Sequence, residues 1–297
     1  MKAQRLGSIE ISKVVELPGL ALPATRLMPN VTPEVLADGR TWLGPQFIDP
    51  DAEIVFLSFH SYVVKTPRHN VLVDTCCGTH KSRESMPAWH MLNTPYLDEL
   101  AALSLRPEDI DVVLCTHLHA DHVGWNTKLL DGRWVPTFSN ARYIIGQHEY
   151  DHWHRLHADN PSPPINRGSF ADSVLPVVAS GQAVMVPSDF RVEAELGEGV
   201  WLEASPGHSP GHVSVHVMGG GQHCLLSGDA IHHPLQLTHP HLSIAADFDR
   251  AQAIATRLDI LRRLADTSTL LLTAHFPEPT SGRVVKYRDA VRFEFSD

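Results

Sequence analysis

Four short apolar stretches of this chain each end on an aspartate or a histidine. The stretches VLVD, VVLCTH, LLSGD and LLLTAH end at Asp74, His117, Asp229 and His275. Such a short apolar run is typical of a buried strand, and the polar residue marks where the chain leaves the sheet. The four strand ends therefore predict a sheet-based fold with a polar site along one edge.

Strand and helix patterns alternate along the rest of the chain. Strands are predicted at 1–19, 53–66, 70–75, 111–116, 141–146, 183–186, 200–204, 213–218, 223–227 and 269–274, and helices at 94–105, 147–157 and 249–265. Thr94 is the expected cap of the first helix, and Ile254, Leu258, Leu261 and Ala265 form the expected buried stripe of the last. The Pro-rich stretch 158–168 is expected to be a surface insertion. This alternation predicts one layered α/β domain over 1–297.

Composition excludes several classes of function. The net charge is −10 with no block of basic residues, and no apolar run approaches the ~20 residues of a membrane span. Nucleic acid and membrane are therefore not expected partners, and a small molecule is. The first residues lack the apolar core of a signal peptide, so we expect a cytoplasmic protein. The four cysteines form no CxxC pair, and no disulfide framework is indicated.

The segment CTHLHADHVGW, residues 115–125, has the strongest chemical pattern. Imidazole and carboxylate groups suit zinc or a similar divalent ion. His117 and His119, two residues apart at a strand end, can reach one ion together. Asp121 and His122 do not fit around that same ion. The segment therefore predicts two ions, each only partly supplied with ligands.

Three later features can complete the two sites. SPGHSPGH places His208 in a loop framed by glycines and prolines, LLSGDA ends a strand at Asp229, and LLLTAHF ends a strand at His275. Each of these residues lies at a junction between strand and loop, as the first cluster does.

Together, H-x-H-x-D-H, the glycine-framed histidine, the Gly-Asp and the late histidine resemble the metallo-β-lactamase superfamily over about residues 50 to 280. The resemblance implies a four-layer αββα sandwich with two metals, and Asp74 as a support behind the ligands. It assigns His117, His119 and His208 to the first metal, Asp121, His122 and His275 to the second, and Asp229 as a bridge between them. Zinc is the expected metal, and iron, manganese and cobalt suit the same ligands.

Another motif in the chain competes with this interpretation. HEYDH, residues 148–152, matches H-E-x-x-H, in which His148 and His152 would hold zinc beside Glu149 as a base. The motif is short, a histidine-rich chain produces it by chance, and no third ligand follows at a convincing spacing. A zinc peptidase is therefore a remote alternative, and the preferred interpretation is an exposed helix.

The resemblance implies hydrolysis by a metal-bridging hydroxide. Asp229, Asp121 and His232 are the candidate catalytic residues. The bridging aspartate, the N-terminal extension 1–50 and the acidic turn ADFDRAQAI make the pattern closest to the branch of lactonases and organophosphate (methyl parathion) hydrolases. That branch implies a small ester or lactone as substrate, phosphotriesterase activity in addition, and a homodimer to which residues 1–50 contribute.

The chain departs from the family pattern at two points. Cys76 and Cys77 precede Gly78 where the family usually has a glycine directly after the threonine, and His232 stands where lactonases often carry a tyrosine. A histidine there still has a proton to donate to an oxyanion or a leaving group.

The substrate pocket is less well defined by the sequence. Trp125 follows the histidine segment directly and is the first candidate for a pocket wall. The other candidates are Trp153, Phe170, His233 and Phe276, although each aromatic taken singly is more often a core residue. A thioesterase or β-lactamase-type hydrolase of the same fold is the nearest alternative, and a non-catalytic metal-binding module is a remote one.

Overall fold

A computed structural model describes residues 1–159, 165–192, 199–287 and 290–296. The chain forms two compact units. We call Ala3–Glu16 and Phe59–Phe190 the first unit, and Met1–Lys2, Leu17–Ser58 and Arg191–Asp297 the second. Within the predicted insertion 158–168, residues 160–164 lie outside the described part.

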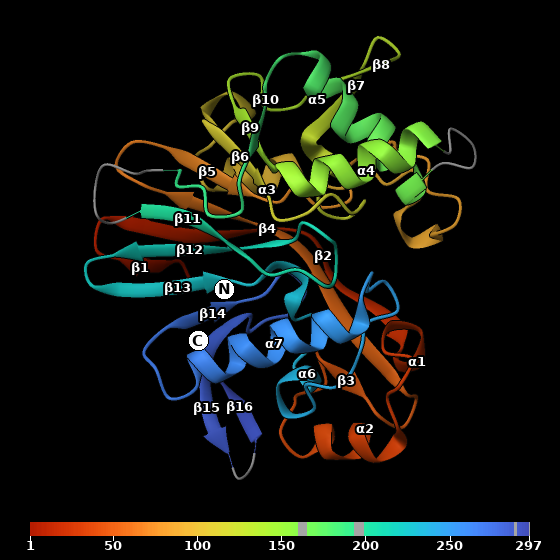
Figure 1. Cartoon of the computed structure of the whole chain (residues 1–297), viewed down its shortest axis with the longest axis vertical. Coiled ribbons are helices and arrows are strands. Elements are labelled where there is room, and N and C mark those ends of the chain that lie inside the picture. The colour runs from red at the N-terminus through yellow and green to blue at the C-terminus, as the bar shows by residue number, and fades with distance from the viewer. Residues whose placement is uncertain (160–164, 193–198, 288–289, 297) are drawn as a thin grey trace. The chain divides into compact units, whose positions relative to one another are not determined.

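Two strands cross the boundary between the units, β2 (Ile9–Pro23) and β4 (Ile54–Lys65). The other elements of the first unit are β1 (Gln4–Leu6), β5 (Asn70–Val73), α3 (Tyr96–Ala102), β6 (Val112–Cys115), β7 (Thr127–Leu130), β8 (Arg133–Pro136), β9 (Arg142–Gly146), α4 (Gln147–Asp159), α5 (Leu175–Ala179) and β10 (Ala183–Val186). The strands β5, β6, β9 and β10 pair in parallel in that order (Figure 1). Apolar, buried sequences are what a parallel sheet with both faces covered requires.

The second unit contains β3 (Ile48–Asp49), β11 (Gly199–Ala204), β12 (Val213–Gly219), β13 (Gln222–Leu226), β14 (Leu270–Leu272), β15 (Ser281–Tyr287), β16 (Ala290–Phe295), α1 (Ala24–Leu27), α2 (Pro33–Arg40), α6 (Leu235–Thr238) and α7 (Arg250–Leu264). Strands β11 to β16 form one sheet in chain order, with β13 and β14 parallel and the other neighbours antiparallel. Asp249 caps α7 by accepting a hydrogen bond from the Gln252 N–H at 3.0 Å.

The other predicted strands and helices are confirmed, but the strand predicted at 1–19 is two antiparallel strands, β1 and β2, separated by a turn at Gly7 and Ser8. Two further details are wrong. Helix α3 begins at Tyr96 after Pro95, and Thr94 makes no cap because its hydroxyl donates to Glu16. In α7 the predicted stripe is misplaced, since Leu258 is 39 % exposed and Arg257 is buried. The Arg257 guanidinium donates from Nε to the Ala230 carbonyl oxygen and from Nη1 to those of Pro240 and Leu242, which offsets part of the cost of burying its charge.

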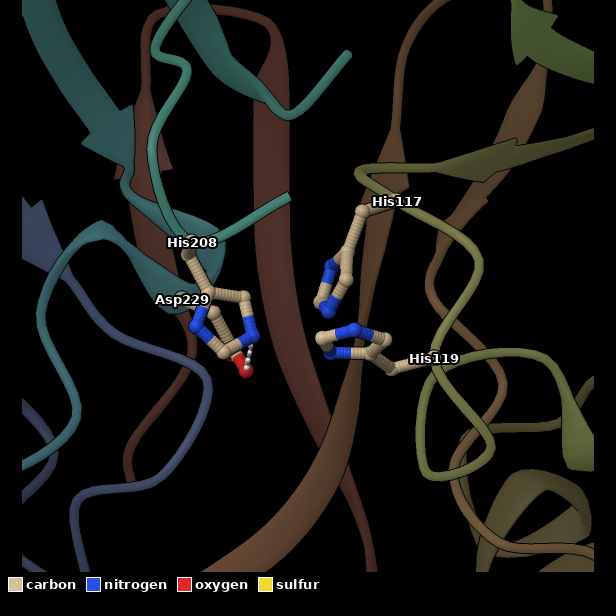
Figure 2. Close-up of side chains that lie close together, drawn as sticks. All are labelled: His117, His119, His208 and Asp229. Carbon is tan, nitrogen blue, oxygen red and sulfur yellow. Dashed lines mark ion pairs between the residues drawn. The ribbon is translucent and has the colours of Figure 1, made fainter. Parts of the chain in front are cut away.

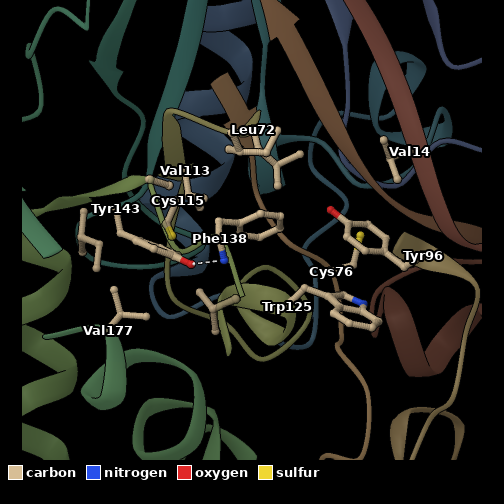
Figure 3. Packing of buried hydrophobic residues seen from close by; sticks show 14 of the residues in the cluster. Val14, Leu72, Cys76, Tyr96, Val113, Cys115, Trp125, Phe138, Tyr143 and Val177 are labelled. Atoms are coloured by element: carbon tan, nitrogen blue, oxygen red, sulfur yellow. Dashed lines mark hydrogen bonds between the residues drawn. The ribbon is translucent and has the colours of Figure 1, made fainter. Parts of the chain in front are cut away.

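The core of the first unit surrounds the ends of its parallel strands. Figure 3 shows the Trp125 ring against Tyr96, with a centroid separation of 5.2 Å and an interplanar angle of 17°. On another side of this core the Phe138 N–H donates to the Tyr143 hydroxyl at 3.1 Å. The loop that follows β6 is therefore anchored by packed aromatic rings.

The four cysteines are all buried free thiols, as the absence of a disulfide pattern predicted. Among the described residues, the helices are too short or too polar to cross a bilayer.

Candidate metal-binding site

The loop after β6 gathers the predicted histidines of the first unit. The His117 ring centroid lies 4.6 Å from that of His119 and 4.1 Å from that of His122. Figure 2 shows His117 and His119 on this loop. His117 and His122 are buried, and His119 and Asp121 are partly exposed. One short loop therefore concentrates three imidazoles and a carboxylate.

Asp74 fixes the start of this loop. Its carboxylate accepts hydrogen bonds from the N–H and hydroxyl of Thr116, both at 2.8 Å, and from His122 Nδ1 at 2.9 Å. A histidine that donates from Nδ1 presents Nε2 as the nitrogen for a metal. The expected supporting role of Asp74 thus has a defined geometry.

The Cys76–Gly78 loop follows a path that requires glycine. Gly78 has a φ of +82°, and a Cβ atom on Gly124 would lie 1.9 Å from the Cys77 carbonyl carbon. The two loops therefore touch through their backbones, and no larger residue fits at Gly124. The two cysteines before Gly78 are buried and leave this close contact in place.

In the second unit, Asp229 lies among three histidines. Its Oδ2 is 3.1 Å from His208 Nε2 and 3.0 Å from His232 Nε2, and its Oδ1 is 3.1 Å from His275 Nε2. Figure 2 shows the ion pair between His208 and Asp229. The ligand atoms of Asp229, His232 and His275 lie within 4.8 Å of one another, which suits a metal ion.

The histidines beside Asp229 are held in place by further hydrogen bonds. His208 Nδ1 donates to Asp247 Oδ1, and His275 Nδ1 donates to the Ser58 carbonyl oxygen, both at 3.0 Å. Although burial alone would lower it, Asp229 and Asp247 raise the pKa of His208 to about 9. The second histidine of SPGHSPGH also contributes, because His212 Nε2 accepts the Asp229 N–H at 2.9 Å.

Two neighbouring histidines have different environments. Burial lowers the pKa of both His232 and His233 to about 4, so both are neutral at pH 7. His233 Nε2 donates to the Phe47 carbonyl oxygen at 2.9 Å, and its Nδ1 accepts from the Leu235 N–H. Both ring nitrogens of His233 are therefore engaged in hydrogen bonds with the backbone, whereas His232 faces Asp229.

The aromatic pocket candidates occupy several places. Trp125 is 4 % exposed and belongs to the core of the first unit, with Nε1 donating to Glu16 at 2.6 Å. Phe170 is buried in the same core, and Phe276 is buried in the second unit. Trp153 is partly buried, and its ring centroid lies 5.5 Å from that of His119. Of these aromatics, Trp153 has a ring contact with a proposed ligand.

The donor chemistry of both groups fits a divalent metal. His122, His208 and His275 each donate from Nδ1 to an acceptor of the protein, which orients Nε2 as the coordinating nitrogen. Neutral imidazole and carboxylate are the ligand types that zinc prefers outside thiolate sites. Sequence reasoning missed the supporting roles of Asp247 and His212, because their contacts with His208 and Asp229 form only in the fold. It considered Glu149 only as the base of HEYDH, whereas in the fold Glu149 accepts from the Leu118 N–H.

The fold is that of an α/β protein, and the loops at its strand ends carry clusters of histidine and aspartate that fit a metal ion. The chain belongs to the metallo-β-lactamase superfamily, whose family profile matches residues 56–275. This is a superfamily of metal-dependent hydrolases, and the predicted fold class and family are confirmed.

Relatives and solved structures agree with this assignment. The N-acyl homoserine lactonase AiiB of Rhizobium rhizogenes is 28 % identical over 193 residues, which are 60 % of this chain and 64 % of that relative. The match thus spans just under two thirds of the relative's length. The dizinc quorum-quenching lactonase AidC has a TM-score of 0.78 at 19 % identity, with 100 % of this chain and 97 % of that chain covered. The hydrolase AbOPH has a TM-score of 0.79 at 20 % identity, covering 99 % and 98 %. At these identities the structural matches show the fold.

Proposed function

We propose that this chain is a dinuclear metal-dependent hydrolase that cleaves a small ester or lactone. The proposed ligands are His117, His119 and His208 for one ion, Asp121, His122 and His275 for the other, and Asp229 for both. Zinc is the proposed metal, in keeping with the dizinc lactonase of the same fold.

The observation that carries the proposal is the position of the Asp229 carboxylate. Its Oδ2 faces His208, a proposed ligand of the first ion, while its Oδ1 faces His275, a proposed ligand of the second. A carboxylate that lies between proposed ligands of both ions would be able to hold both of them. Asp229 is buried, and its own N–H is held by His212, so the two oxygens have a fixed direction.

When bound, a pair of divalent ions supplies an activated water for attack on a carbonyl and the positive charge that polarises it. The side chains of this protein orient those ions. Asp74 and Asp247 hold His122 and His208 in the tautomer that coordinates through Nε2. Both partners are acidic, and an acidic partner raises the basicity of the ligand nitrogen.

His232 is the proposed proton donor of the site. Its main-chain N–H donates to Gln236 Oε1 at 2.8 Å, and its ring stacks on that of His275 at 5.3 Å between centroids. A neutral imidazole has one N–H, which here lies toward Asp229 Oδ2 and would be available to the oxyanion or the leaving oxygen when Asp229 holds metal. The position of His232 beside Asp229 and His275 also fits that of a further metal ligand. His232→Gln should distinguish the two roles, because loss of a ligand weakens metal binding, whereas loss of a proton donor lowers activity with metal affinity unchanged.

The substrate class is proposed from the lactonase relative. Purified enzyme with zinc should be assayed against lactones, aryl esters, phosphotriesters, thioesters and β-lactams. We expect turnover of lactones or aryl esters, with phosphotriesters as weaker substrates, and a loss of at least 100-fold in kcat/KM for Asp229→Asn. Preferential turnover of thioesters or β-lactams would replace the proposed substrate class. No turnover of any compound by a protein with two bound metals would favour a non-catalytic metal-binding module.

A single functional domain, a homodimer that includes residues 1–50, and a cytoplasmic location stay predictions. Size-exclusion chromatography with light scattering measures the oligomeric state.

A further inference from the structure

The H-E-x-x-H helix starts at the same sheet edge as the histidine loop. Strands β6 and β9 pair in parallel, so their carboxyl ends lie side by side. The histidine loop follows β6, and α4 follows β9. Residues of the first turn of α4 are thus in reach of the loop within the first unit.

Leu118, between His117 and His119, is held at both ends of its backbone. Its N–H donates to Glu149 Oε1 at 3.1 Å, and its carbonyl oxygen accepts from Asn166 Nδ2. The Leu118 side chain is itself fully buried. Because peptide units are rigid planes, fixing both groups of Leu118 restricts the backbone torsions on which both imidazoles depend.

Glu149 is built into this contact and does not face solvent. It is 1 % exposed. Trp153, four residues later on α4, donates its Nε1–H to the same Glu149 oxygen at 2.6 Å. The Trp153 ring then meets the His119 ring edge to face at an interplanar angle of 70°. Glu149 and Trp153 therefore contact each other and the histidine loop, Glu149 through the Leu118 N–H and Trp153 through the His119 ring.

Asn166 is fixed from its other side. Its backbone is left-handed, with φ 50° and ψ 43°, a conformation that asparagine tolerates better than most residues. The next carbonyl oxygen, that of Arg167, accepts from Arg83 at 3.0 Å. Arg83 in turn makes a two-point ion pair with Asp172 at 2.7 and 2.9 Å.

We propose that Glu149 and Asn166 are positioning residues that hold the Leu118 peptide and thereby set the spacing of His117 and His119 for a metal ion. This assignment rests on the proposed metal site. It gives the glutamate of HEYDH a role other than that of a peptidase base. Metal ligands must be held to within about half an ångström, and their supporting partners typically contribute 10- to 100-fold in affinity.

Cobalt(II) provides the test, because its visible absorption reports ligand geometry independently of catalysis. Glu149→Ala leaves the Leu118 N–H without its acceptor, so we expect 10- to 100-fold weaker cobalt binding and a shifted spectrum. Glu149→Gln keeps an oxygen that accepts both hydrogen bonds, and should bind cobalt within about threefold of wild type. His148→Gln and His152→Gln, on the same helix, should leave affinity and spectrum unchanged.

The outcomes separate this inference from the proposed function. A folded Glu149→Ala protein with wild-type affinity and spectrum would overturn the inference, and so would a Gln variant as damaged as the Ala variant. Loss of cobalt in His148→Gln would favour the peptidase site instead. Failure of the wild type to bind cobalt would refute the proposed function. If Glu149→Ala does not fold, cobalt binding by Asn166→Ala provides the test. Weaker binding is expected, and unchanged binding would overturn the inference.

Discussion

Replacing Glu16 with glutamine should destabilise the chain, although the two side chains have almost the same shape. Glu16 is 5 % exposed. Its Oε1 accepts from Trp125 Nε1 at 2.6 Å and from the Thr94 hydroxyl at 3.0 Å, and its Oε2 accepts from the Cys77 N–H at 2.7 Å. Both oxygens therefore serve as acceptors, and the carboxylate is the group that meets all three donors.

The magnitude follows from counting the donors left without an acceptor. Glutamine must direct its NH₂ group at either the Cys77 or the Trp125 N–H, so one buried donor loses its partner at about 1–3 kcal/mol. Burial raises the pKa of Glu16, so glutamine also removes part of the cost of a buried charge. We expect a net loss of about 1–2 kcal/mol for Glu16→Gln, and about 4 kcal/mol for Glu16→Ala, which removes every acceptor.

Urea unfolding at pH 7, followed by tryptophan fluorescence and circular dichroism, measures these losses. Glu10→Gln is the matched control, because Glu10 pairs with Arg5 at 3.0 Å on the surface of the same sheet. An exposed pair of this kind contributes less than about 1 kcal/mol. If Glu16→Gln proved as harmless as Glu10→Gln, the account of the Trp125 and Cys77 contacts would be refuted.

The remaining predictions concern a buried lysine, a histidine partner and the metals. Burial lowers the pKa of Lys81 to about 7 from 10.5. The folded chain then binds fewer protons between these values, so stability should rise with pH there by up to about 5 kcal/mol, and Lys81→Met should abolish the rise in pH-dependent unfolding. Asp247→Ala removes the partner of His208 and should weaken zinc binding about 10- to 100-fold in chelator competition; unchanged affinity contradicts this. Chelation by EDTA should lower the melting temperature, and zinc should restore it; a melting temperature indifferent to both argues against bound metal.

The sequence predicted the strands because strands depend on local patterns of apolar residues. The same patterns located the candidate ligands at strand ends, and their role as ligands stays a prediction. Each apolar run that ends on a histidine or an aspartate is a strand followed by a loop. His117, His208 and His275 are examples, all buried at such junctions.

The supporting roles of Glu16 and Asp247 could not be predicted from the sequence, because their partners are distant along the chain. Glu16 meets Trp125 across 109 positions, and Asp247 meets His208 across 39. Trp125, the first candidate for a pocket wall, is a core residue because it stacks on Tyr96. Its position next to the histidine loop carried no information on the side of the loop that it faces.

In helix α7, the sequence pattern also failed to predict that a charged residue is buried. Periodicity placed Leu258 on the buried stripe, because leucine is apolar and arginine is not. In the fold, Arg257 occupies that face and donates to the Ala230 carbonyl oxygen next to Asp229. Hydropathy alone does not predict the burial of Arg257, because that burial depends on carbonyl acceptors from another loop.

The metal content of the purified chain tests the central claim most directly. Elemental analysis by mass spectrometry should find about two zinc ions per wild-type chain after zinc loading and removal of the excess. His117→Gln and His275→Gln should each retain about one, and His148→Gln should retain two. A wild-type chain without tightly bound metal, or two ions retained in both His117→Gln and His275→Gln, would contradict the proposed dinuclear site.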